Sequence, residues 1–274
     1  MITSYISYIS SVKGYSPLTC KAYEKDLRHF VTWAKANLTG ARWSTITRED
    51  IDLYITEFME RGQKPSTTNR RLAAIAGLYG YMKRQGFPVE SPCKFESRRK
   101  IEQTIPNTIP AEQLRTAYEH SAGVARVILG LLITTGIRIG ELMNLQYHDV
   151  DCINNTIKVH GKGAKERVIH VPAEQLYELK CVKEHCSKNG YIFTIPERMA
   201  RRMVYESLKT YCDAPQLSPH AIRHSFATYQ AKQGENVSTI AATLGHNHLE
   251  TTQKYIDLAA AHNCSATITN SIIK

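Results

Sequence analysis

A basic, proline-containing stretch in the first half of the chain most constrains the fold. Residues 88–110 hold four of the ten prolines of this 274-residue sequence, together with the run Arg98-Arg99-Lys100. Proline lacks the amide hydrogen that helices and strands need, so regular structure is interrupted here. A chain of this length can form two modest domains. We therefore predict one domain at 1–97, a linker at 98–109 and a second domain at 110–274.

The first domain has the apolar spacing of four helices. Two helices are expected within residues 1–37, with Ser16 and Pro17 opening the second. Thr47 and Ser66 are suited to cap the third and fourth helices. Short connections between four helices indicate a compact helical bundle.

The second domain is predicted to be mainly helical with a small antiparallel sheet, which makes the whole chain mainly α (α+β). Residues 156–160 and 167–171 have β-type composition, and the glycine-rich turn between them predicts a hairpin. Helices are expected at 111–121, 123–134, 138–145, 173–187, 196–211, 219–233 and 236–244.

The charge of the chain favours a polyanionic partner. The formal net charge is +10, and the first 100 residues hold 17 Lys+Arg against 9 Asp+Glu. A basic surface binds DNA or RNA through its phosphates. The general electrostatic attraction is therefore expected mainly from the N-terminal domain.

Several protein classes find no support in the sequence. The seven cysteines are scattered without a CxxC pair, which favours a reducing cytoplasm. Cys181, His185 and Cys186 lack a fourth ligand, so no metal is expected. The longest apolar run, Val127 to Ile133, is too short to span a membrane, and no signal peptide is evident.

Two arginines and a tyrosine carry the chemistry. Arg138 lies in TTGIRIGEL, Arg223 in HAIRH and Tyr255 in QKYID. Guanidinium groups hold a phosphate through several fixed donors, and a tyrosine oxygen can form a covalent intermediate by attacking phosphorus. The sequence shows neither a nucleotide-binding loop nor a metal motif beside them, so the set suits phosphodiester cleavage without a cofactor.

Residues three positions from Arg138 and Arg223 are expected to lie on the same helical face as these arginines. Glu141 follows Arg138 by three positions and can brace it from behind. His220 and Arg223 are also three apart, so both face one way, and His220 is our candidate general base or proton relay for Tyr255. His224 is expected to point elsewhere, in a structural or surface role.

The order of five motifs resembles that of tyrosine site-specific recombinases of the Xer or simple phage-integrase kind. The motifs are TTGIRIGEL, GKGAKERVIHV, SPHAIRHSFAT, TLGHNH and TTQKYID, and the resemblance covers nearly the whole chain. It implies a SAM-like core-binding domain followed by a catalytic domain. It also implies that Arg138 and Arg223 clamp the scissile phosphate, that Lys162 protonates the leaving 5′-oxygen and that Tyr255 forms a 3′-phosphotyrosyl link.

The resemblance also selects His246 over His248 as a phosphate-binding histidine. His246 precedes Tyr255 by nine residues, about two and a half helical turns, so the chain must bend between them. We expect the bend at Asn247.

DNA contacts are predicted at two further places. They are the start of the fourth helix and the arm of the hairpin, with Lys64, Thr67, Thr68, Arg70, Arg71, Lys165 and Arg167. The basic linker either crosses the DNA backbone or is an ordinary solvated loop.

The implied partner is double-stranded DNA with inverted-repeat core sites, bound by a homotetramer that passes through a Holliday junction. Accessory proteins are possible and a membrane is not expected; the location would be cytoplasmic, on the nucleoid in a prokaryote. The tail from residue 256 is expected to dock on a neighbouring protomer. A type IB topoisomerase-like enzyme and a non-catalytic DNA-binding protein of the same fold remain alternatives, and integration, excision and dimer resolution stay undecided.

Overall fold

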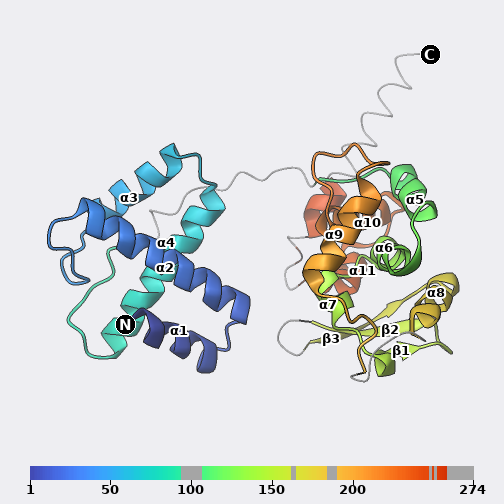
Figure 1. Ribbon diagram of the computed structural model, residues 1–274, viewed down its shortest axis with the longest axis horizontal. Helices are drawn as coiled ribbons and strands as arrows, with labels where there is room; N and C mark the ends of the chain where they lie inside the picture. Colours follow the sequence, from blue (N-terminus) through green and yellow to red (C-terminus); the bar gives the residue numbers. More distant parts are fainter. Residues whose placement is uncertain (94–106, 162–164, 184–189, 247–248, 250–251, 258–274) are drawn as a thin grey trace, which may run out of the picture. The chain divides into compact units, whose positions relative to one another are not determined.

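The computed structural model divides into two compact units, Met1–Gln103 and Thr104–Lys274, each of which has its own core (Figure 1). The structure describes residues 1–93, 107–161, 165–183, 190–246, 249 and 252–257. Most of the predicted linker lies outside these residues, so the predicted domain limits stay a prediction.

The N-terminal unit contains the four expected helices. They are α1 (Ile2–Ser11), α2 (Pro17–Asn37), α3 (Arg48–Glu60) and α4 (Pro65–Arg84). The Ser16 side chain accepts a hydrogen bond from the amide of Thr19, and Thr47 forms a reciprocal capping box with Asp50. The predicted Ser66 cap is wrong, because α4 begins one residue earlier, at a proline that suits a first helical turn.

The second unit is mainly helical with a small antiparallel sheet, as predicted. Its elements are α5 (Ala111–Glu119), α6 (Gly123–Thr135), α7 (Ile139–Met143), a 3₁₀ turn (Tyr147–Asp149), β1 (Val150–Asp151), β2 (Thr156–His160), β3 (Glu166–His170), α8 (Ala173–Lys183), α9 (Glu197–Leu208), α10 (Pro219–Lys232) and α11 (Val237–Leu244). The sheet is antiparallel in the order β1-β2-β3, and Thr156 pairs with His170. Figure 1 shows the strands gathered at one end of this unit.

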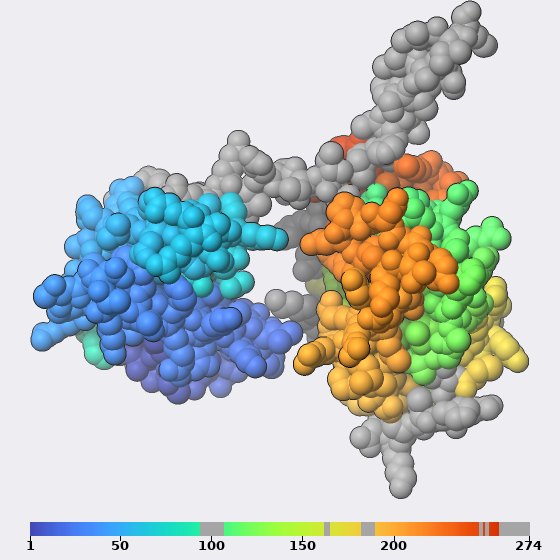
Figure 2. Space-filling view, turned by 45° about the horizontal axis from the view of Figure 1, so that its top comes forward, coloured from blue at the N-terminus to red at the C-terminus, as the bar shows by residue number. Residues whose placement is uncertain are grey.

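Helix α6 forms the centre of the second unit. It packs against α5, α8, α9 and α10, and Leu129 and Leu131 are fully buried. In Figure 2 the orange segment that includes α10 and the green segment of α5 and α6 are adjacent at the surface of this unit. Gly136 ends α6 in the left-handed conformation, at φ +63°, and a side chain there would collide with Phe226. This tight turn delivers the chain directly to Arg138.

Among the described helices, none combines the length and the apolarity needed to cross a lipid bilayer.

Candidate active site

A cavity of about 820 Å³ lies where α7, the β2–β3 hairpin, α9, α10 and the end of α11 meet. Most of the charged side chains that line it are basic. Its polar and charged lining includes Arg138, Glu141, Lys165, Glu166, Arg167, Glu197, Arg201, His220, Arg223 and His246. Such a lining attracts a phosphate group.

Arg138 and Arg223 converge on one carbonyl group. Arg138 Nη1 and Arg223 Nη2 both donate to the Leu244 carbonyl oxygen, at 3.3 and 2.5 Å. Arg223 Nη1 also donates to the Gly136 carbonyl oxygen at 2.8 Å. The two guanidinium groups, far apart in the sequence, therefore lie side by side in the cavity wall.

The environment of Arg223 suits an anion. Arg223 is 2% exposed, and burial, followed by the charge of Arg138, lowers the pKa of its guanidinium to about 9. The buried Arg223 loses hydration, and the nearby positive charge of the more exposed Arg138 repels it. A phosphate placed between them would offset both costs.

Glu141 contacts Arg138 through its side chain. Arg138 Nη1 donates to Glu141 Oε1 at 2.8 Å, and the Arg138 amide donates to Oε2 at 3.1 Å. Burial alone would raise the pKa of the Glu141 carboxyl, but the hydrogen bonds and charge of Arg167 and Arg138 outweigh it and lower the pKa. The carboxylate is therefore ionised at neutral pH.

The Arg167 side chain is largely buried and contacts Glu141, the same carboxylate that contacts Arg138. Its guanidinium donates to Glu141 Oε2 at 2.7 Å and to the Thr243 carbonyl oxygen at 2.8 Å, and its side chain is 13% exposed. This placement argues against direct contact with the DNA backbone and indicates that Arg167 fixes Glu141. Lys165 is exposed, as a DNA contact requires.

Lys162, the predicted general acid, lies outside the described residues. The hairpin is closed just before it, where the Gly161 amide donates to the Lys165 carbonyl oxygen at 2.7 Å. Gly161 and Lys165 both line the cavity, so this end of the hairpin borders the cationic site.

His220 and His246 both line the cavity. Burial, then the charges of Arg223 and Arg138, lowers the pKa of His220. The same causes lower the pKa of His246 to about 4. Both rings are therefore neutral at neutral pH, and His246 Nδ1 lies 2.8 Å from Thr252 Oγ1.

The chain does break between His246 and Tyr255. Helix α11 ends at Leu244, and Gly245 adopts φ +66°. Residues 252–257 are again helical. The predicted bend at Asn247 lies outside the described residues, but Gly245 already redirects the chain.

Tyr255 is buried beside the arginines, and its hydroxyl group meets an unexpected partner. The side chain is 3% exposed and packs with Ile240 and Leu244. Burial raises the pKa of its phenol, against the opposing charges of Arg223 and Arg138. The hydroxyl group lies 2.5 Å from His224 Nδ1.

The expectation that His224 points elsewhere is therefore wrong. His224 lies four residues after His220, which places it about 40° around the same helix. Spacing i to i+4 was the signal that could have found it.

Arg201 is a second residue that the sequence analysis missed. It lines the cavity from α9, and its Nε donates to Glu197 Oε1 at 2.8 Å. Nothing in the α9 sequence distinguishes Arg201 from Arg198 or Arg202, because only the packing of α9 decides which arginine faces the cavity.

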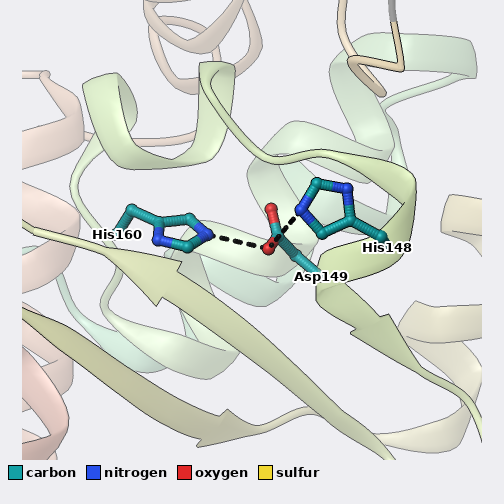
Figure 3. A group of neighbouring side chains, drawn as sticks. All are labelled: His148, Asp149 and His160. Atoms are coloured by element: carbon teal, nitrogen blue, oxygen red, sulfur yellow. Dashed lines mark hydrogen bonds and ion pairs between the residues drawn. The ribbon is translucent and has the colours of Figure 1, made fainter.

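One group of metal-ligand type occurs in the described part of the chain, at the turn end of the β2–β3 hairpin (Figure 3). Asp149 Oδ1 lies 2.8 Å from His160 Nε2 and 3.5 Å from His148 Nε2. His160 Nδ1 also lies 3.1 Å from Glu166 Oε1. These contacts account for the cluster, because they tie the 3₁₀ turn to β2 and β3. The sequence analysis expected no metal at Cys181, His185 and Cys186. Residues 185 and 186 lie outside the described part of the chain.

The predicted DNA contacts of the N-terminal unit divide into two groups. Lys64 and Arg70 are exposed and Thr67 is partly exposed, although Arg70 also donates to Asp26 at 2.7 Å. Thr68 and Arg71 are buried.

Arg71 belongs to the packing of the N-terminal core. It donates to the Tyr54 hydroxyl group at 2.7 Å and stacks 3.7 Å from the centre of the Phe58 ring. These contacts argue against a DNA-binding role for Arg71, and burial argues against one for Thr68.

Comparison with known proteins now decides the family. The Phage integrase family matches residues 107–262, and the Phage integrase N-terminal SAM-like domain matches residues 2–86. This chain belongs to the phage integrase family. The recombinase is 30% identical over 284 residues to the tyrosine recombinase XerC of Myxococcus xanthus, covering 93% of this chain and 92% of that protein. It is 29% identical to XerC of Thermodesulfovibrio yellowstonii, covering 95% and 92%.

Solved structures share the fold. The recombinase matches XerH bound to palindromic difH substrate in a post-cleavage complex, with a TM-score of 0.79, 17% identity and coverage of 97% and 84%. It matches a lambda integrase dimer bound to a COC′ core site, with a TM-score of 0.71, 16% identity and coverage of 93% and 75%. The predicted family, the mainly helical fold and the DNA breaking-rejoining activity are thereby confirmed. The topoisomerase-like and non-catalytic alternatives are not favoured.

Proposed function

We propose that this site-specific recombinase cuts DNA with Tyr255 while Arg138 and Arg223 hold the scissile phosphate. The observation that carries the proposal is the convergence of both guanidinium groups on the Leu244 carbonyl oxygen. Donors fixed in this way stabilise the charge that develops on a pentacoordinate phosphorus. His220 and His246 add neutral hydrogen-bonding groups to the same cavity.

The proposed reaction conserves the energy of the phosphodiester. The Tyr255 oxygen attacks phosphorus, the bond to the 5′-oxygen breaks, and Lys162 gives that oxygen a proton. The 5′-hydroxyl group of a partner strand then reverses these steps on the phosphotyrosine and reseals the DNA. Neither a metal nor a nucleotide cofactor is required by this sequence of steps. Because Tyr255 is 3% exposed, DNA binding must open a local path to its hydroxyl group.

The proposed substrate is double-stranded DNA with inverted-repeat core sites, held by four protomers. The names of the solved DNA complexes support DNA as the partner. On the N-terminal unit, Lys64, Thr67 and Arg70 are our remaining candidates for backbone contacts, because their side chains reach the surface. The tail from residue 256 is proposed to join neighbouring protomers, and accessory proteins are proposed as further partners.

Mapping of covalent adducts tests this function. Protein-linked DNA ends would be captured from the source genome after incubation with the recombinase and then sequenced. We expect adducts at one recurrent sequence with inverted symmetry. Adducts scattered without sequence preference, or relaxation of a plasmid that lacks the site, would contradict site-specific recombination.

A further inference from the structure

The hydroxyl group of Tyr255 lies against His224, one helical turn beyond the histidine that spacing had selected. His224 Nδ1 is 2.5 Å from the phenolic oxygen, and the two rings are 5.5 Å apart between centres. His224 lies on α10, which Ser218 caps through a hydrogen bond with the Ala221 amide. His224 therefore belongs to a helix whose N-terminus is capped.

The two histidines of α10 connect the buried phenol with the cavity. The ring centres of His220 and His224 are 4.2 Å apart, and their planes meet at 68°. His220 lines the cavity, whereas His224 contacts Tyr255. The order Tyr255, His224, His220 thus runs from the nucleophile to the solvent-accessible space.

The charge states fit a proton acceptor. Burial, then the nearby His220 and Arg223, lowers the pKa of His224 to about 4, so its ring is neutral at neutral pH. Burial raises the pKa of the Tyr255 phenol, which keeps its proton. We therefore assign the phenol O–H as the donor to His224 Nδ1, which places the ring hydrogen of the neutral imidazole on Nε2.

We propose that His224 is a catalytic residue that orients the Tyr255 hydroxyl group and accepts its proton during attack on phosphorus. The inference rests on the proposed function. The phenolic O–H bond breaks and its proton moves to Nδ1 as the O–P bond forms. The P–O5′ bond breaks, and the 5′-oxygen takes a separate proton from the general acid assigned to Lys162. In rejoining, His224 returns its proton to the departing phenolic oxygen.

A bound phosphate makes this transfer easier at the moment it is needed. A phosphodiester between Arg138 and Arg223 adds negative charge beside Arg223, whose positive charge helps to lower the pKa of His224. Formation of the pentacoordinate state adds further negative charge. Both changes favour protonated His224, and the proton has to move only as the new bond makes the phenolic oxygen more acidic.

Single-turnover cleavage of a nicked suicide substrate tests the role of His224. His224→Asn keeps a polar atom near the position of Nδ1 but cannot take a proton. We expect it to bind DNA like the unaltered enzyme and to form the Tyr255 adduct about 100-fold more slowly or worse. His170→Asn, at an exposed histidine of β3 outside the cavity lining, is the matched control and should cleave normally.

A fluorinated tyrosine at position 255 separates chemistry from structure. Its more acidic phenol needs less help from a base, so it should accelerate cleavage much more in His224→Asn than in the unaltered background. Equal acceleration in both backgrounds, or normal cleavage by His224→Asn, would overturn the proposal. His224→Gln takes the place of His224→Asn if thermal unfolding shows that the latter is not folded. If the unaltered enzyme forms no Tyr255 adduct, the proposed function itself has failed.

Discussion

Replacement of Glu141 by glutamine should weaken the active-site domain and slow cleavage without weakening DNA binding. The Glu141 and Arg167 side chains are 9% and 13% exposed, so their ion pair is largely buried. The Arg138 side chain is 43% exposed, so its ion pair with Glu141 contributes less to the stability of the fold. Glutamine keeps one acceptor oxygen, replaces the other with an NH2 donor and loses the charge.

The expected loss of stability follows from the two hydrogen bonds that Arg167 donates to Glu141, at 2.7 and 3.2 Å. A charge-assisted hydrogen bond contributes about 1 kcal/mol more than a neutral one, so Glu141→Gln should cost about 2 kcal/mol. In a domain of this size that lowers Tm by about 4–8 °C. Loss of the carboxylate also frees Arg138 to move, for which we expect roughly tenfold slower cleavage or worse.

The assay combines thermal unfolding, DNA binding and single-turnover cleavage. Glu112→Gln, an exposed carboxylate on α5 of the same unit, is the matched control and should change little. The affinity of Glu141→Gln for DNA should equal or exceed that of the unaltered enzyme, because removal of a negative charge makes the cavity more positive. A Glu141→Gln protein that unfolds and cleaves like the unaltered enzyme would refute the assignment of Glu141 as the brace.

The lowered pKa of Glu141 also predicts how the Tm difference between the unaltered enzyme and Glu141→Gln changes with pH. The pKa of the Glu141 carboxyl is lowered in the folded protein, so its ionised form stabilises the fold. That contribution is fully present above the ordinary carboxyl value of about 4.3 and is lost as pH falls through the lowered value. The difference in Tm between the unaltered enzyme and Glu141→Gln should therefore be constant near neutral pH and shrink in acid. A difference that grows in acid would contradict the reasoning.

Three further predictions concern other parts of the chain. Lys162→Ala should cleave normal DNA poorly but cleave a substrate with a bridging 5′-sulfur well, because a thiolate leaves without a general acid; equal defects on both substrates would count against Lys162. Arg70→Ala should lower the slope of binding against salt by about one unit, and Arg71→Ala should instead lower Tm because its partners are buried; the reverse pattern would place the DNA-binding face elsewhere. Deletion of residues 264–274 should leave single-site binding intact and reduce synaptic complexes on native gels, whereas normal tetramers and normal recombination would exclude the tail as the link between protomers.

Local signals in the sequence predicted the elements well. The caps at Ser16 and Thr47 depend on residues three positions away, so they can be identified from the sequence alone. The end of α6 and the β2–β3 hairpin were also predicted from nearby residues. The start of α4 was misplaced because both Pro65 and Ser66 suit a helix start, and only the backbone decides between them.

Tertiary contacts explain what the sequence did not predict. Arg71 and Arg167 look like solvated cations until Tyr54, Phe58 and Glu141 are brought beside them by folding. His224 is a different case, since helical spacing already placed it near His220. Its role became visible only when the short helix of Tyr255 packed against α10.

The identity of the nucleophile is the central claim, and adduct trapping on a nicked suicide substrate tests it most directly. The trapped complex would be digested with protease, and the DNA-linked peptide would be sequenced by mass spectrometry. We predict one adduct, on Tyr255, and none with Tyr255→Phe, which should bind the same DNA with unchanged affinity. An adduct on any other residue, or one that persists in Tyr255→Phe, would contradict the account.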